Sequence, residues 1–209
     1  MTADFGARRA WNILLTPKAE WAVIDGEPAS VRSLYVPYVL VLAAVGPLAL
    51  LIGGQTLGYN AFGVNFRPTL GAGLTAAAVN YGVALVGVFM VALAINGLAP
   101  RFGGTRNRVQ ALKVAVYSST AAWLAGVFQI TPTLLVFSIV GFYSLYLLAL
   151  GLPRLMKIPR ERATGAFIAT MAASLIIWIV IGVIGNVLTR FLIKSAGLTG
   201  AVGITVTGG

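Results

Sequence analysis

Residues 70–98 read LGAGLTAAAVNYGVALVGVFMVALAINGL and contain no charged side chain. An α-helix rises about 1.5 Å per residue, and the hydrocarbon core of a bilayer is roughly 30 Å thick. As a helix, this stretch is therefore long enough to cross a membrane. Its excess length indicates a helix that is tilted or that projects from one face of the bilayer.

Four further apolar runs occupy residues 34–54, 111–128, 133–152 and 164–193. The chain is 58% hydrophobic and only 10% charged, whereas soluble domains carry about 25% charged residues. Together the five runs predict an all-α, polytopic integral membrane protein with five transmembrane helices between residues 34 and 194. Pro47 lies inside the first run and should kink that helix, because proline has no N–H to donate.

The two ends of the chain differ from this apolar region. Residues 1–33 are amphipathic and mix aromatic, aliphatic and arginine side chains, among them Phe5, Trp11, Leu15, Arg8 and Arg9. Such a mixture favours a helix that lies in the headgroup region of a membrane. Thr16 and Pro17 predict a helix start, with threonine as the N-cap and proline at the first helical position. The Gly- and Thr-rich tail, residues 195–209, is expected to be flexible.

The charge distribution predicts the orientation of the five spans. The net charge is +10, and twelve of the fifteen Lys and Arg residues lie in the N-terminal segment and in the connections at 99–113 and 153–163. If five spans alternate, these three segments lie on one side, which the positive-inside rule assigns to the cytoplasm. We therefore predict a cytoplasmic N-terminus and an external C-terminus. The basic residues then act as topology signals, and we expect no nucleic-acid partner.

The residues that most membrane enzymes need are missing. The chain has no Cys and no His, and no Asp or Glu falls inside a predicted span. Thiolate nucleophiles and His ligands are thus excluded, and proton-coupled transporters or aspartyl proteases would need carboxylates at membrane depth. We predict a non-enzymatic protein with no cofactor and no metal site.

Two groups of residues are candidates for function. The first is basic and flanks the predicted spans on the cytoplasmic side: Arg101, Arg106, Arg108, Arg154, Lys157, Arg160 and Arg162. These residues can set the topology alone, or they can also bind anionic lipid headgroups or a cytoplasmic protein. The second is a polar seam between the third and fourth spans: Ser118, Ser119, Thr120, Tyr143, Ser144 and Tyr146. These can hydrogen-bond between helices, or line a path for a ligand or lipid.

Small residues recur four apart at three places: Gly73 with Ala77, Ala121 with Ala125, and Ala169 with Ala173. Such pairs allow helices to approach closely. They are interpreted as packing sites inside the chain, and a homodimer contact is the alternative.

Several stretches are similar to bacterial members of the Yip family of membrane proteins. They include NILLTPKAEWAVI at residues 12–24, LYVP at 34–37, AVYS at 115–118, ITP at 130–132 and YSLYLL at 143–148. The resemblance covers roughly residues 12–190. It implies five spans with the N-terminus in the cytoplasm and the C-terminus outside, in a bacterial inner membrane.

The eukaryotic relatives in this family are adaptors in vesicle traffic that bind prenylated Rab GTPases and influence membrane shape. They carry an Asp-Leu-Tyr-Gly-Pro motif before the first span. The corresponding residues here are Ser33, Leu34, Tyr35, Val36 and Pro37, without the Asp and the Gly. GTPase binding is therefore not carried over to this chain.

Two functions of different classes remain open from the sequence. The first is a membrane organiser or adaptor that acts through lipid contact and cytoplasmic partner docking. The second is a small transporter, channel or lipid-translocating protein that uses the polar seam. An enzyme ranks below both, because the spans offer almost no acid or base.

Overall fold

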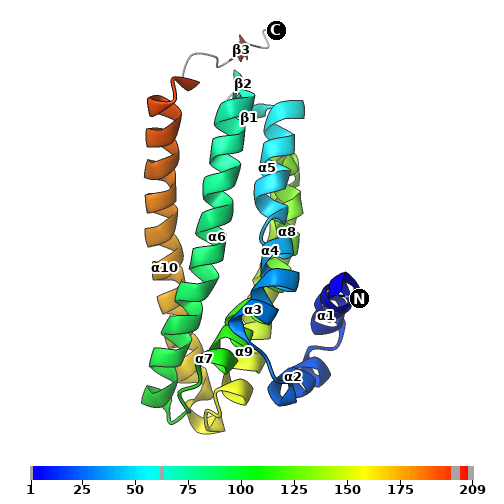
Figure 1. The fold of residues 1–209 in the computed structure, drawn as a ribbon, viewed down its shortest axis with the longest axis vertical. Helices are drawn as coiled ribbons and strands as arrows, with labels where there is room; N and C mark the ends of the chain where they lie inside the picture. The colour runs from blue at the N-terminus through cyan, green and yellow to red at the C-terminus, as the bar shows by residue number, and fades with distance from the viewer. Residues whose placement is uncertain (1, 62–63, 199–202, 207–209) are drawn as a thin grey trace.

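A computed structural model of the chain describes residues 2–61, 64–198 and 203–206, most of which are helical (Figure 1). Four helical stretches are long and apolar enough to cross a membrane: Leu70–Phe102, Arg108–Ile130, Pro132–Leu155 and Arg160–Ser195. A shorter apolar helix covers Leu40–Thr56. The described residues thus contain five candidate spans, and the predicted all-α polytopic membrane fold is confirmed.

The long spans differ in how regular they are. α6 (Leu70–Leu98) and α10 (Arg160–Ser195) are continuous and run side by side along the long axis (Figure 1). α6 continues into a short 3₁₀ helix, η2 (Ala99–Phe102). The two spans between them are mixed, and consist of α7 (Arg108–Ser118), α8 (Thr120–Ala125), η3 (Gly126–Ile130), η4 (Pro132–Phe142) and α9 (Tyr143–Leu155), with η3 and η4 in 3₁₀ form.

The first predicted span is broken rather than simply kinked. It begins with α3 (Val31–Leu34), continues through a π-helical turn, η1 (Tyr35–Val39), and then forms α4 (Leu40–Leu42) and α5 (Val45–Thr56). The break between α4 and α5 lies one turn before Pro47. This position follows from the missing N–H of Pro47, which cannot donate to the carbonyl of Ala43.

Glycines let α5 touch the backbone of η3. A Cβ placed on Gly53 would lie 1.8 Å from the carbonyl oxygen of Ile130, and one on Gly126 would lie 2.9 Å from Cα of Gly46. No larger residue fits such contacts without moving a helix. The predicted small-residue site at Gly73 also packs inside the chain, against Gln55 and Leu51 of α5.

A small antiparallel sheet, which the sequence did not predict, joins the connection after α5 to the C-terminal tail. Its strands are β1 (Tyr59–Ala61), β2 (Val64–Arg67) and β3 (Gly203–Val206), in the order β1-β2-β3. Asn60 pairs with Asn65, and Asn65 with Thr205. The tail was predicted to be flexible, and its residues 199–202 and 207–209 lie outside the described residues.

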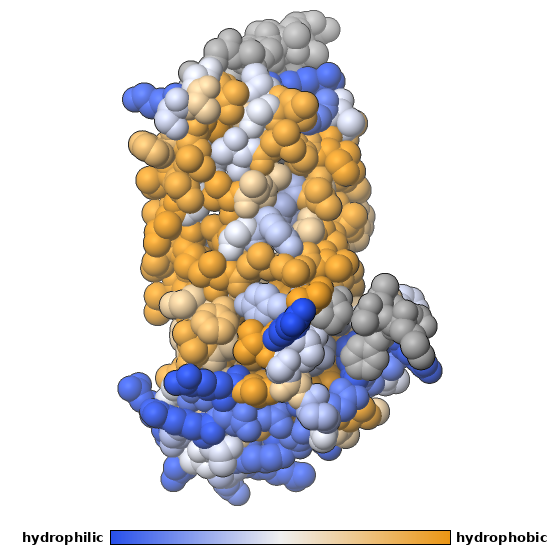
Figure 2. Space-filling model, viewed as in Figure 1, coloured by the Kyte–Doolittle hydropathy of each residue, from blue (hydrophilic) through white to orange (hydrophobic). Residues whose placement is uncertain are grey.

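The surface and the core agree with a membrane location. Figure 2 shows a broad hydrophobic belt across the middle of the face in view, with hydrophilic residues at both ends and most of them at the lower end. The exposed apolar side chains of α10, such as Ile176 and Val183, suit contact with lipid. The tightest packing lies toward the lower end, where α1 (Thr2–Leu15) and α2 (Pro17–Gly26) meet α7 and α9 and bury Ile13, Trp21, Ile24, Leu112 and Leu152.

Candidate functional site

The seven basic candidates lie on two connections that are held together at one end of the bundle. All seven side chains are exposed, and the group is called the basic platform: Arg101, Arg106, Arg108, Arg154, Lys157, Arg160 and Arg162. The backbone N–H of Thr105 in the first connection donates to the carbonyl of Met156 in the second, at 2.8 Å. The structure therefore unites two groups that are about fifty residues apart in sequence.

Two glycines allow the connections to meet. Gly103 has a φ of +79°, which favours glycine, and it ends η2. A Cβ on Gly104 would lie 2.6 Å from the carbonyl oxygen of Met156, so only glycine fits there. The platform is therefore built by the backbone, which leaves its long basic side chains available for contacts outside the chain.

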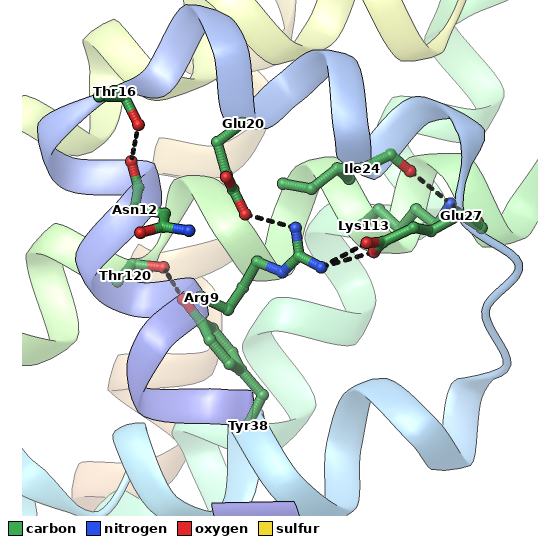
Figure 3. A network of polar contacts seen from close by, with 9 residues as sticks. All are labelled: Arg9, Asn12, Thr16, Glu20, Ile24, Glu27, Tyr38, Lys113 and Thr120. Atoms are coloured by element: carbon green, nitrogen blue, oxygen red, sulfur yellow. Dashed lines mark hydrogen bonds and ion pairs between the residues drawn. The ribbon is translucent and has the colours of Figure 1, made fainter. Parts of the chain in front are cut away.

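An ionic cluster attaches the two N-terminal helices beside this platform (Figure 3). The cluster consists of Arg9 on α1, Glu20 on α2, Glu27 just after α2, and Lys113 on α7. One guanidinium nitrogen of Arg9 donates to Oε1 of Glu20, and the other lies 2.6 Å from both carboxylate oxygens of Glu27. Arg9 is only 5% exposed, so the structure buries a charge that a surface helix would keep in water.

Lys113 binds the C-terminal end of α2. Its ammonium donates to the carbonyl of Ile24 at 2.8 Å and to that of Glu27 at 2.5 Å. The last carbonyls of a helix lack partners within the helix and carry partial negative charge, so a cation is favourable there. Lys113 is only 3% exposed, so its side chain is buried against the chain itself.

Asp25 connects α2 with the platform. Its carboxylate lies 2.6 Å from the ammonium of Lys157, and Gln110 on α7 donates to both its backbone and its side-chain oxygen. Lys157 is thus the one member of the platform that forms an ion pair within the described residues. The other six are all arginines.

Aromatic rings also pack where α1 and α2 contact the bundle. Trp21 is 1% exposed and meets the edge of the Tyr117 ring, while Tyr38 meets the same ring from another element. The guanidinium carbon of Arg9 lies 6.0 Å from the centre of the Tyr117 ring, within the range of a cation–π contact. A Cβ on Gly151 would collide with Trp21, which shows how closely α2 lies on α9.

The charge of Arg9 is secured by its partners. Burial works against the charged guanidinium, but the hydrogen bond and attraction of Glu27, with the attraction of Glu20, raise the pKa of Arg9 above its usual value. Arg9 and Lys113 oppose the carboxylates of Glu20 and Glu27. The cluster therefore holds α1 and α2 against the bundle through ion pairs and hydrogen bonds.

The six residues of the predicted polar seam separate into two groups. Ser118, Ser119 and Ser144 line a cavity inside the bundle. The other three lie elsewhere: Thr120 hydrogen-bonds the hydroxyl of Tyr38, Tyr143 donates to the carbonyl of Leu14 on α1, and Tyr146 is exposed. The structure therefore does not bring the six together into one continuous seam.

The ionic cluster is the part of the site that sequence reasoning missed. One face of the N-terminal segment packs on the bundle, where Ile13 and Ile24 are fully buried, while Trp11 and Leu15 are exposed. Its place in the headgroup region stays a prediction. The sequence did contain a signal for ion pairs between the N-terminal segment and the connections. Four of the five acidic residues precede residue 28, while the connections are basic. The threonine cap also failed: α2 does start at Pro17, but the Thr16 hydroxyl donates back to Asn12.

Comparisons with known proteins agree with this fold. The profile of a family described as the Yip1 domain matches residues 11–206. The inner membrane protein YohC of Escherichia coli K12 is 27% identical over 172 residues, which cover 80% of this chain and 88% of YohC. YohC of E. coli O6:H1 matches to the same extent. No solved structure matches the chain.

Proposed function

Because the chain belongs to the Yip1 domain family, we propose that it is a non-enzymatic organiser of the bacterial inner membrane that works through its cytoplasmic face. The inner membrane is the location given in the name of its relative YohC. The proposed orientation has the N-terminus and the basic platform in the cytoplasm and the C-terminus outside, which follows from the positive-inside rule.

One observation carries the proposal, namely that the side chains of the basic platform are exposed and form only one ion pair with the described part of the chain. Arginines near the surface of an anionic membrane contribute roughly 1 kcal/mol each to lipid attraction. A guanidinium can also hold a phosphate with two parallel hydrogen bonds, which a single ammonium cannot do. The platform is therefore suited to lipid phosphates in the cytoplasmic leaflet.

The docked N-terminal helices add a second surface beside the platform. Trp11 is 66% exposed and Leu15 62% exposed on α1, whereas the opposite face of the segment is buried. An exposed apolar face next to a basic surface is typical of a site that meets a membrane surface or a partner helix. A cytoplasmic protein partner would dock here, on α1, α2 and the platform together.

Replacing four platform residues should reduce the binding of anionic lipid. A variant with Arg154→Gln, Lys157→Gln, Arg160→Gln and Arg162→Gln is expected to retain at least roughly tenfold less phosphatidylglycerol than the natural protein, because charge attraction is lost. The measurement is native mass spectrometry of protein released from nanodiscs that contain phosphatidylglycerol and phosphatidylcholine. The retention of phosphatidylcholine should not change.

The chain offers a matched control at its other end. Arg67, Arg190 and Lys194 are exposed there, and replacing them with Gln removes similar charge far from the platform. This control should retain phosphatidylglycerol as the natural protein does. Equal losses in the two variants, or no loss in either, would show that the platform does not recruit anionic lipid.

A further inference from the structure

A cavity of about 440 Å³ lies between the helices and is lined by residues of α5, α6, α7, α8, η3, α9 and α10. Five of its polar residues are near the middle of the candidate spans: Asn80 on α6, Ser118 and Ser119 where α7 meets α8, Ser144 on α9 and Ser174 on α10. A sixth, Gln129, comes from η3. The cavity therefore lies at mid-depth in the membrane. Figure 2 shows paler, more polar residues that interrupt the hydrophobic belt at this height.

The polar lining is neutral and has unused hydrogen-bonding capacity. None of the lining residues in the described chain is charged. Ser144 accepts from the backbone N–H of Ala122 and keeps its own hydroxyl proton, whereas Ser119 donates to Ala115 and keeps its lone pairs. Asn80 donates to Ala76, which leaves its carbonyl oxygen as an acceptor. Donors and acceptors thus surround one space.

Ser174 gives the clearest indication of a ligand. Its hydroxyl oxygen is buried and has no hydrogen-bond partner in the described chain. In a hydrocarbon environment no water is at hand, and an unsatisfied polar group costs several kcal/mol. A polar group of a bound molecule would satisfy this hydroxyl.

The remaining walls are apolar and determine what else the ligand must carry. Trp123, Leu145 and Trp178 line the cavity beside the serines. A volume of this size falls within the range of small-molecule sites, roughly 300–1,000 Å³. A phosphate or a carboxylate would have to enter without a cation to pair with it, which is costly. An uncharged head with hydroxyl or ester oxygens and an attached acyl chain meets every requirement.

We propose that this cavity binds an uncharged glycerolipid of the diacylglycerol class, whose hydroxyl and ester oxygens meet Ser174, Ser144 and the neighbouring polar groups. The apolar walls hold the start of its acyl chains. This site is separate from the basic platform, so it stands or falls independently of the proposed function.

The test uses a photoactivatable diacylglycerol with a diazirine in one acyl chain, applied to the full chain in nanodiscs. Peptide mapping should place the labels on residues around the cavity, and unlabelled diacylglycerol should compete for them. Photoactivatable phosphatidylglycerol and phosphatidylcholine with the same acyl chain serve as charged and zwitterionic comparisons, and should label these residues at least roughly fivefold less, since they lack a match to the neutral lining.

Two matched variants locate the site. Ser174→Leu fills the cavity and should reduce cavity labelling roughly tenfold or more, because it removes both space and a hydrogen bond. Ser138→Leu alters a serine whose hydroxyl is likewise buried without a partner, but away from the cavity, and should leave labelling within about twofold of the natural protein. Equal labelling by the phospholipid probes, no competition in the natural protein, or equal losses in the two variants would each overturn the proposal.

Discussion

Arg9→Met should release α1 and α2 from the bundle while the transmembrane helices stay folded. The substitution leaves the carboxylate of Glu20 buried and that of Glu27 without its bidentate partner. Removing one partner of a buried ion pair typically costs 3–5 kcal/mol, because the other charge remains out of water. Hydrogen exchange should therefore speed up by roughly a hundredfold or more in the backbone amides of α2.

Arg8→Met is the matched control for this prediction. Arg8 is the neighbouring residue on α1, carries the same charge and is exposed. Its replacement should change the exchange of α2 by less than about threefold. If Arg8→Met and Arg9→Met have the same effect, the buried cluster does not hold the N-terminal helices.

Removing the two carboxylates together with Arg9 should restore much of the docking. In a variant with Arg9→Met, Glu20→Gln and Glu27→Gln, the side chains at positions 20 and 27 are uncharged. No carboxylate is then left without its arginine partner. Replacing both sides of a buried ion pair is often nearly neutral, whereas removing one partner alone is costly. Exchange in α2 should therefore return to within roughly tenfold of the natural protein.

Gly53→Ala should weaken the contact between α5 and η3. A methyl group at this position would come 1.8 Å from the Ile130 carbonyl oxygen, and a backbone carbonyl cannot turn aside as a side chain can. The two segments must separate, and overpacking of this kind costs about 1–3 kcal/mol, occasionally more. The midpoint of thermal unfolding of the purified protein in mild detergent should fall by several degrees.

Gly82→Ala provides the control on α6. Gly82 is also inside a helix, but nothing lies within 4 Å of the position its Cβ would take. Alanine is favoured over glycine inside helices by up to about 1 kcal/mol, so this variant should be as stable as the natural protein or slightly more stable. A Gly53→Ala protein that unfolds at the same temperature as Gly82→Ala would refute the close contact.

The spans were predictable because the bilayer imposes a length and a composition on them. The run at 70–98 contains no charge, and α6 covers the same residues. No neighbouring segment needs to be known for this prediction, since a helix satisfies its own backbone in hydrocarbon. The direction of the spans rests on the charge count and on the family resemblance, and it remains a prediction.

The type of helix inside each span, α or 3₁₀, was not predictable in the same way. Residues 126–142 are largely 3₁₀-helical, although their composition would also suit an α-helix. The contacts at Gly46, Gly53 and Gly126 bring two backbones together there, and such packing depends on residues that are far apart in the sequence. Local propensity cannot choose between helix types when tertiary contact decides.

The ionic cluster was hidden for a related reason. Lys113 binds carbonyls that lie more than eighty residues earlier, and Arg9 joins two carboxylates on another segment. Each of these residues, taken alone, looks like an interfacial charge. Only the complementary charges of the N-terminal segment and the connections gave a hint, and that hint does not specify partners.

A platform that binds lipids of the cytoplasmic leaflet and a cytoplasmic protein must face the cytoplasm. Single-cysteine labelling measures this orientation directly. The natural chain has no Cys, so Thr105→Cys reports on the platform alone and Ser195→Cys on the opposite end of α10. In intact spheroplasts, a membrane-impermeant maleimide should label Ser195→Cys, and should label Thr105→Cys only after lysis. Labelling of Thr105→Cys in intact spheroplasts, with Ser195→Cys protected until lysis, would contradict the proposed function.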